Sequence, residues 1–117
     1  MNVLICGDRN WTDQETIRQR MSKLPPNTTI IEGEARGADT IARDLAIEMG
    51  FTVLSFPANW EEYGQAAGVI RNTKMLIEGK PDIVIAFHPN ITKSKGTKDM
   101  VTKAKKAHVP VEVITGR

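Results

Sequence analysis

Residues 33–39 combine residue types that bind phosphate in many proteins. Gly33 and Gly37 stand four positions apart with Arg36 between them, after an apolar run and before an amphipathic one. Backbone N–H groups at the start of a helix bind phosphate, and the arginine adds positive charge, so this spacing favours a phosphate-binding loop. The third glycine of the dinucleotide fingerprint and the Gly-Lys-Ser/Thr of a Walker loop are absent. Asp39 has two interpretations, as the cap of the following helix or as an acceptor for a sugar hydroxyl.

A second loop of this kind follows the first apolar run, at residues 7–11. Gly7 allows a sharp turn or the close approach of a ligand, and Arg9 can clamp a phosphate with two hydrogen bonds. Trp11 either covers a base or seals the edge of the sheet by packing.

A third loop, at residues 93–98, contains small residues that lead into a predicted helix. Gly96 and Thr97 can offer backbone N–H groups and a hydroxyl to an anion, while Lys93, Lys95 and Lys98 raise the local positive potential. A plain role for Thr97 as a helix cap is the alternative.

Residues 59–72 form an unusual polar and aromatic segment. Trp60 and Tyr63 can frame a ring, while Arg71 and Asn72 offer a fork of donors and an amide. Glu61 is expected to be an exposed charge more than a catalytic group.

The chain contains no recognisable catalytic or metal-binding constellation. His88 and His108 are isolated, and no Ser-His-Asp arrangement or metal-ligand spacing occurs, so we expect no metal and no cofactor. We expect Cys6 to be a small core residue. Weak candidates for acid-base chemistry are Asp8, Glu34, Asp39 and Glu61.

Five apolar runs alternate with helical patterns. The predicted strands are residues 3–6, 28–31, 51–56, 82–87 and 109–114, and the predicted helices lie at about residues 13–24, 39–49, 66–79 and 97–107. Residues 58–65 are predicted to be irregular. This alternation indicates an α/β protein, a three-layer Rossmann-like domain over residues 1–117 with a five-stranded, mainly parallel sheet and helices on both faces. Ligands of such sheets bind at the carboxyl ends of the strands, so the three loops above are expected on one edge.

Composition excludes several classes of protein. The 117 residues are 40% hydrophobic and 26% charged, unlike collagen-like, disordered or disulfide-rich chains. Three Phe, two Trp and one Tyr are too few for the stacking platforms of single-strand binders. The single cysteine favours a reducing compartment, and without a leader or a long apolar segment we expect a cytoplasmic protein with no membrane contact.

The charge is unevenly distributed along the chain. Residues 1–90 hold nine Lys and Arg against twelve Asp and Glu, whereas residues 91–117 hold seven against two. A solvated helix face or an anionic partner explains such a basic end.

Motifs in nearly the whole chain resemble the YspA-type (YpsA-related) branch of the SLOG superfamily. They are Gly7-Asp8-Arg9, Gly33-x-Ala35-Arg36-Gly37-Ala38-Asp39, Trp60-x-x-Tyr63-Gly64, Ala67-Gly68-x-x-Arg71-Asn72-x-x-Met75 and Gly96-Thr97-x-x-Met100. The superfamily also contains DprA proteins and LOG phosphoribohydrolases. The resemblance implies a Rossmann-like fold and a nucleotide-type ligand, with ADP-ribose or another NAD-derived signal proposed for this branch.

Two departures from the family pattern stand out. Glu34 replaces a second glycine and brings a negative charge to the loop. Met100 stands where LOG enzymes carry a catalytic glutamate, so their activity does not carry over by motif. Asp99, one position earlier, is turned by about 100° on a helix and is a poor substitute.

The sequence leaves three possible functions open. The first is binding of a nucleotide-type small molecule, the second hydrolysis of an N-glycosidic or phosphoester bond in it, and the third nucleic-acid binding through the basic end, which the low net charge disfavours. For the oligomeric state, the sequence allows a homodimer or larger homo-oligomer as well as a monomer. The expected ligand contacts are Gly7, Asp8, Arg9, Trp11, Gly33, Ala35, Arg36, Gly37, Asp39, Trp60, Tyr63, Arg71, Asn72, Gly96 and Thr97.

Overall fold

Strands and helices alternate along the chain as the sequence predicts. The computed structural model describes residues 1–116. The strands are β1 (Asn2–Gly7), β2 (Thr29–Glu32), β3 (Thr52–Ser55), β4 (Ile83–Phe87) and β5 (Val111–Ile114). The helices are α1 (Gln14–Met21), α2 (Ala38–Glu48), α3 (Trp60–Tyr63), α4 (Ala67–Gly79) and α5 (Gly96–Lys106), with 3₁₀ turns η1 (Gly64–Ala66) and η2 (Ile91–Lys93).

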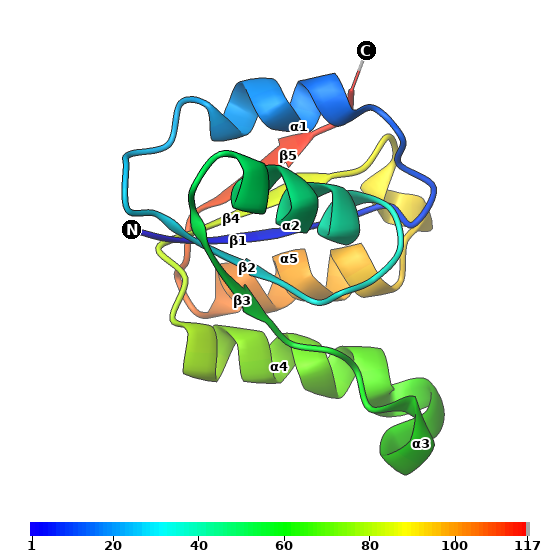
Figure 1. The fold of residues 1–117 in the computed structure, drawn as a ribbon. Coiled ribbons are helices and arrows are strands. Elements are labelled where there is room, and N and C mark those ends of the chain that lie inside the picture. Colours follow the sequence, from blue (N-terminus) through cyan, green and yellow to red (C-terminus); the bar gives the residue numbers. More distant parts are fainter. Residues whose placement is uncertain (117) are drawn as a thin grey trace.

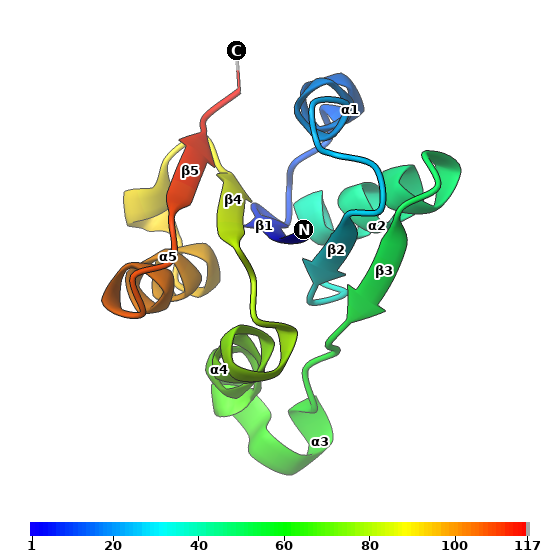
Figure 2. The same ribbon diagram turned by 90° about the vertical axis from the view of Figure 1, so that its left-hand side faces the viewer.

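The strands form one sheet in the order β3-β2-β1-β4-β5, and every pairing in it is parallel. Helices α1 and α2 cover one face of the sheet, and α4 and α5 cover the other (Figures 1 and 2). The predicted three-layer Rossmann-like α/β fold is therefore confirmed, and the sheet is parallel throughout the described residues.

The apolar run of β1 is explained by its central place in the sheet. Val3 and Ile5 pack into the core under α1 and α2, whereas Leu4 and Cys6 pack into the core with α4 and α5. Successive side chains of a strand point to opposite faces, so a strand covered on both sides needs apolar residues at every position.

The strand order reverses between β1 and β4. After β3 the chain crosses the sheet through α4 and places β4 on the free side of β1. Gly7 and Phe87, the last residues of these strands, are register partners. Because α1 and α5 then leave on opposite faces, a crevice opens beyond these two strand ends, where doubly wound sheets bind their ligands.

One stretch of secondary structure was predicted wrongly. Residues 58–65, predicted to be irregular, contain α3 and lead into η1. The Asn59 side chain caps α3 by accepting a hydrogen bond from the Glu62 backbone N–H at 3.1 Å. A helix of four residues is too short to show an apolar period, which is why the sequence pattern did not reveal it.

Candidate functional site

Two adjoining pockets lie at the carboxyl ends of the strands and form one groove. The first, the switch pocket, has a volume of about 390 Å³. It is lined by Cys6, Gly7, Asp8, Arg9, Asn10, Ala35, Asp39, Arg71, Asn72, Met75, His88, Lys93, Ser94, Lys95, Gly96 and Thr97. The second, the outer pocket, has a volume of about 480 Å³ and is lined by Arg9, Gly33, Glu34, Ala35, Arg36, Pro57, Ala58, Trp60 and Arg71. Arg9, Ala35 and Arg71 line both pockets and join them.

The groove brings together most of the residues that the sequence singled out. Of the expected ligand contacts, Trp11, Gly37 and Tyr63 line neither pocket. Of the weak acid-base candidates, Glu61 also lies outside both.

Gly7, the last residue of β1 before its loop, lies too close to its neighbours to carry a side chain. A Cβ at this position would lie 2.2 Å from the Phe87 carbonyl oxygen and 2.7 Å from the Ala38 Cβ. Arg9, further along the loop, is exposed, and its guanidinium carbon lies 5.9 Å from the centre of the Trp60 ring. This cation-π contact joins the β1 loop to α3 across the groove.

The loop after β2 uses its backbone N–H groups internally. The Glu34 N–H donates to Glu32 Oε1 at 2.8 Å, and the N–H groups of Gly33 and Ala35 donate to Asp39 Oδ2 at 3.1 and 3.3 Å. Two carboxylates therefore occupy these three amides, which are not free to bind a phosphate. The predicted binding of phosphate by N–H groups at the start of the helix stays a prediction. Arg36 is exposed and remains as this loop's positive group.

Asp39 is neither the helix cap nor a surface group. The N-cap of α2 is Gly37, and the Asp39 side chain turns back to the loop with 4% of its surface exposed. Burial raises the pKa of Asp39 to about 7, although Arg71 and the two amide hydrogen bonds act in the opposite direction.

Glu32, at the end of β2, is a second buried carboxylate that the sequence analysis missed. It is 0% exposed, and it accepts hydrogen bonds from the Ser55 hydroxyl and the Glu34 N–H. Burial raises its pKa, and these hydrogen bonds offset part of the shift. A charged residue at the end of a β-branched strand is the signal that could have indicated it.

Two neighbouring residues of α4 connect the loops on either side of the groove. Arg71 Nη1 donates to the Gly33 carbonyl oxygen at 2.6 Å, and its Nε donates to Asn72 Oδ1 at 3.0 Å. Asn72 is 3% exposed, and its Nδ2 donates to the Gly96 carbonyl oxygen at 3.1 Å and to Asp99 Oδ2 at 3.0 Å. The β2 loop and the start of α5 are thereby fixed relative to each other.

The first turn of α5 faces the switch pocket. The N-cap of α5 is Lys95, so the alternative of Thr97 as a helix cap is wrong. The Ser94 hydroxyl accepts the Thr97 N–H at 2.9 Å. Nothing lies within 4 Å of a Cβ built on Gly96, which leaves the start of the helix open. The partial positive charge of this terminus adds to that of Lys93 and Lys95, both exposed.

The position that is glutamate in LOG enzymes lies in the core here. Met100 is 0% exposed and packs against β1 and β4. Asp99 accepts hydrogen bonds from Asn72 and from Lys103 Nζ, the latter at 2.9 Å, and lies outside both pockets.

Trp11 belongs to the core under α1 and α2. It is 8% exposed, its ring meets the Phe87 ring edge-on with centroids 5.6 Å apart, and its Nε1 donates to the Asp13 carbonyl oxygen. Packing, one of its two sequence interpretations, is what these contacts support. Trp60 is 51% exposed and lines the outer pocket.

His88 is a pocket residue that the sequence analysis did not select. It directly follows β4, is 8% exposed, and its Nδ1 accepts the Asn90 N–H at 3.0 Å. The same strand-end rule that selected its loop could have identified it. Burial also raises the pKa of the Cys6 thiol, another lining group.

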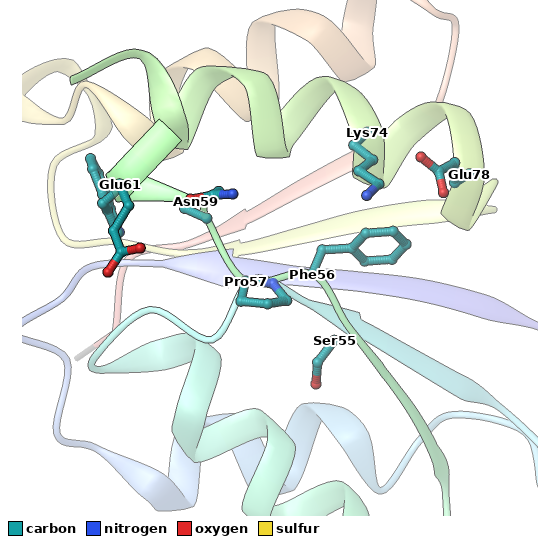
Figure 3. A pocket seen from close by; sticks show the side chains of 9 residues that line it. Ser55, Phe56, Pro57, Asn59, Glu61, Lys74 and Glu78 are labelled. Carbon is teal, nitrogen blue, oxygen red and sulfur yellow. The ribbon is translucent and has the colours of Figure 1, made fainter. Parts of the chain in front are cut away.

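A further hollow of about 670 Å³ lies between the end of β3 and α4 and adjoins the outer pocket, with which it shares Pro57, Ala58 and Trp60. In Figure 3 the Phe56 ring lies between the β3 backbone and Lys74 and Glu78 of α4, while the Ser55 side chain points away from that helix. Lys74 and Glu78 carry opposite charges, so this hollow presents no net charge from α4 to a ligand.

Among residues 1–116, no three His, Cys, Asp or Glu side chains gather in a geometry that could hold a metal ion. None of the helices in this range is both long and apolar enough to span a membrane.

Comparison with known proteins agrees with the fold and the motifs. The sequence profile of the YspA, cpYpsA-related SLOG family matches residues 1–63. The Gene 61 protein of Mycobacterium phage D29 is 37% identical over 118 aligned residues, which cover 93% of this chain and 92% of that protein. DNA processing protein A (DprA) from Streptococcus pneumoniae has a similar fold, with a TM-score of 0.78 over 99% of this chain at 17% identity, and this chain spans 50% of that protein's length. By its sequence match and its fold, the chain belongs to the YspA, cpYpsA-related SLOG family.

Proposed function

We propose that the groove binds a nucleotide or nucleotide-derived small molecule, with ADP-ribose or another NAD-derived compound as the leading candidate. The observation that carries this proposal is the continuity of the two pockets through Arg9 and Arg71. One end of the groove offers positive charge and an open helix start, and the other offers an exposed aromatic ring. A molecule with phosphate at one end and a ring at the other matches both.

The phosphate of such a ligand would lie in the switch pocket. Lys93 and Lys95 stand beside the first turn of α5, and the Thr97 side chain lies at the same end. Backbone N–H groups in the first turn of a helix stabilise anions together with the helix dipole. Arg71 reaches the same space from α4.

The ring of the ligand would lie in the outer pocket. Trp60 is half exposed and lines this pocket together with Pro57. Arg36 lines the same pocket and would meet a second phosphate or a sugar edge. Glu34 lines the same pocket and would accept a hydrogen bond from a donor group of the ligand.

The test is identification of a retained ligand followed by titration. Purified protein is denatured, released small molecules are identified by mass, and ADP-ribose, NAD and nucleoside monophosphates are titrated by calorimetry. We expect Arg36→Ala and Lys95→Ala to weaken binding about tenfold or more, as loss of a charge-assisted contact does. Lys106→Ala, an exposed lysine at the far end of α5, is the matched control and should leave affinity unchanged. If every nucleotide fails to bind, or if the pocket variants bind as the control does, the proposal is wrong.

Nucleic-acid binding is a second candidate, favoured by one observation. Lys98, Lys105 and Lys106 of α5 are exposed and form no ion pair among the described residues. The fold neighbour from Streptococcus pneumoniae is named for DNA processing. Phosphate contacts would make such binding steeply dependent on salt, so gel shifts that stay negative at low salt exclude it.

A further inference from the structure

Asp39 presents one carboxylate oxygen to the protein and the other to the groove. Its Oδ2 accepts the N–H groups of Gly33 and Ala35, whereas Oδ1 has no hydrogen-bond partner among residues 1–116. No fully buried polar side-chain atom of these residues lacks a partner. Oδ1 therefore keeps contact with solvent, and because Asp39 lines the switch pocket, that contact is made from the pocket.

The groups around Asp39 set the balance between its charged and neutral forms. Arg71 of α4 favours the charged form, whereas Glu32 at the end of β2 and the burial of the side chain oppose it. Cys6 of β1 lies close enough for its ionisation to be affected by Asp39. Burial dominates and raises the pKa of Asp39 to about 7, so both forms are populated at neutral pH.

Other charged or titratable groups share the pocket. Asp8 and Arg9 come from the β1 loop, His88 from the end of β4, and Lys93 and Lys95 from the loop before α5. An anion drawn to these cations would enter a space into which Asp39 turns a free oxygen. Two negative charges at short range in a partly desolvated site repel strongly, and a proton on one of them removes that repulsion.

We propose that Asp39 is protonated whenever an anionic group occupies the switch pocket, and that its neutral carboxyl donates a hydrogen bond from Oδ1 to that group. The proton comes from solvent, and no bond in the ligand is broken. This inference rests on the proposed function, which places an anion in this pocket, and adds a pH-dependence to it. Affinity is then highest in mild acid and falls as the pH rises above neutral.

Calorimetry with ligands of constant charge tests this directly. ADP-ribose and inorganic sulfate keep their charge between pH 6 and 8.5, so a change in affinity reports on the protein. We expect binding to be roughly tenfold weaker at pH 8.5 than at pH 7. Titrations at pH 7 in buffers of different ionisation enthalpy should show net uptake of about half a proton per anion bound.

Two variants separate Asp39 from its neighbours. In Asp39→Asn the amide oxygen can still accept the two loop N–H groups while the amide nitrogen donates into the pocket, as the neutral acid would. This variant should bind at pH 8.5 about as tightly as the wild type at pH 6, with no pH-dependence. His88→Gln replaces the imidazole that lines the same pocket and should keep the wild-type pH-dependence.

The outcomes distinguish the inference from the proposed function. Binding without proton uptake overturns the inference and leaves the function standing. Affinity that rises with pH, with weaker binding by Asp39→Asn, also overturns it and makes the charged carboxylate an acceptor for a sugar hydroxyl. If neither probe binds at any pH, the proposed function fails and the inference fails with it. Should Asp39→Asn not fold, the wild-type proton count alone decides.

Discussion

Arg71 lies against the backbone of Gly33, and the contact leaves no room for a side chain on that glycine. Arg71 Nη1 donates to the Gly33 carbonyl oxygen at 2.6 Å, and a Cβ on Gly33 would lie 2.3 Å from the same nitrogen. The space beside this glycine is thus filled by the end of a side chain that comes from 38 positions away in the chain. Because Arg71 lines both pockets, the fit of the β2 loop and the shape of the groove depend on one contact.

Replacing Gly33 by alanine should displace Arg71 and disturb both pockets. The added methyl group displaces the guanidinium, the far end of a flexible side chain, and breaks its hydrogen bond to the Gly33 carbonyl oxygen. We expect a loss of about 1 kcal/mol in the free energy of unfolding, on the order of one hydrogen bond. Ligand affinity should fall with it. Urea unfolding and calorimetric titration measure the two effects.

Gly68→Ala is the control for this prediction. Gly68 lies in α4, and a Cβ there would approach an Arg71 nitrogen only to an ordinary 3.8 Å. Alanine also favours helix over glycine. This variant should be as stable as the wild type or more so; equal destabilisation by both substitutions would show that the Gly33 contact is unimportant.

Asn72→Ala should loosen the start of α5. The substitution removes two donated hydrogen bonds and leaves the Arg71 Nε without its acceptor, at a buried position. We expect a loss of about 1 to 3 kcal/mol in stability and faster hydrogen exchange in the first turn of α5. Thr73→Ala, an exposed neighbour, is the control. Unchanged exchange at residues 96–99 would contradict the prediction.

The strands were predictable from sequence, whereas the use of the loop amides was not. A strand covered on both faces leaves a continuous apolar run, as at Ile83–Phe87, and that signal is local. Whether the amide of Gly33 is free depends on where the side chain of Asp39 points once α2 has packed, and that is a tertiary property. The pattern of glycines in this loop is equally compatible with a phosphate nest and with a loop held by its own carboxylates.

Substitution of the two tryptophans should affect different properties: stability for Trp11 and ligand binding for Trp60. Trp11→Ala leaves a cavity against Phe87 in the core, and we expect a loss of about 3 to 5 kcal/mol in stability. Trp60→Ala removes an exposed ring and should change stability by less than about 0.5 kcal/mol, while weakening binding of ADP-ribose. Chemical unfolding and titration of both variants check this, and equal affinity of Trp60→Ala and wild type would remove the ring from the proposed site.

Stability itself should fall as the pH rises from about 4 to about 7. In the folded protein Asp39 has a pKa of about 7, raised from 3.8, so the folded state holds a proton that the unfolded state has lost. Stability decreases with pH wherever the folded state binds more protons, and the contribution is complete below the unfolded pKa and lost above the folded one. Glu32, whose pKa is also raised, acts in the same direction. We expect the free energy of unfolding, measured with urea, to drop by a few kcal/mol, on the order expected for such shifts.

Asp39→Asn carries no such charge, so its stability relative to the wild type should rise across this range. Parallel curves of stability against pH for the two proteins would show that Asp39 ionises as freely in the folded state as in the unfolded one.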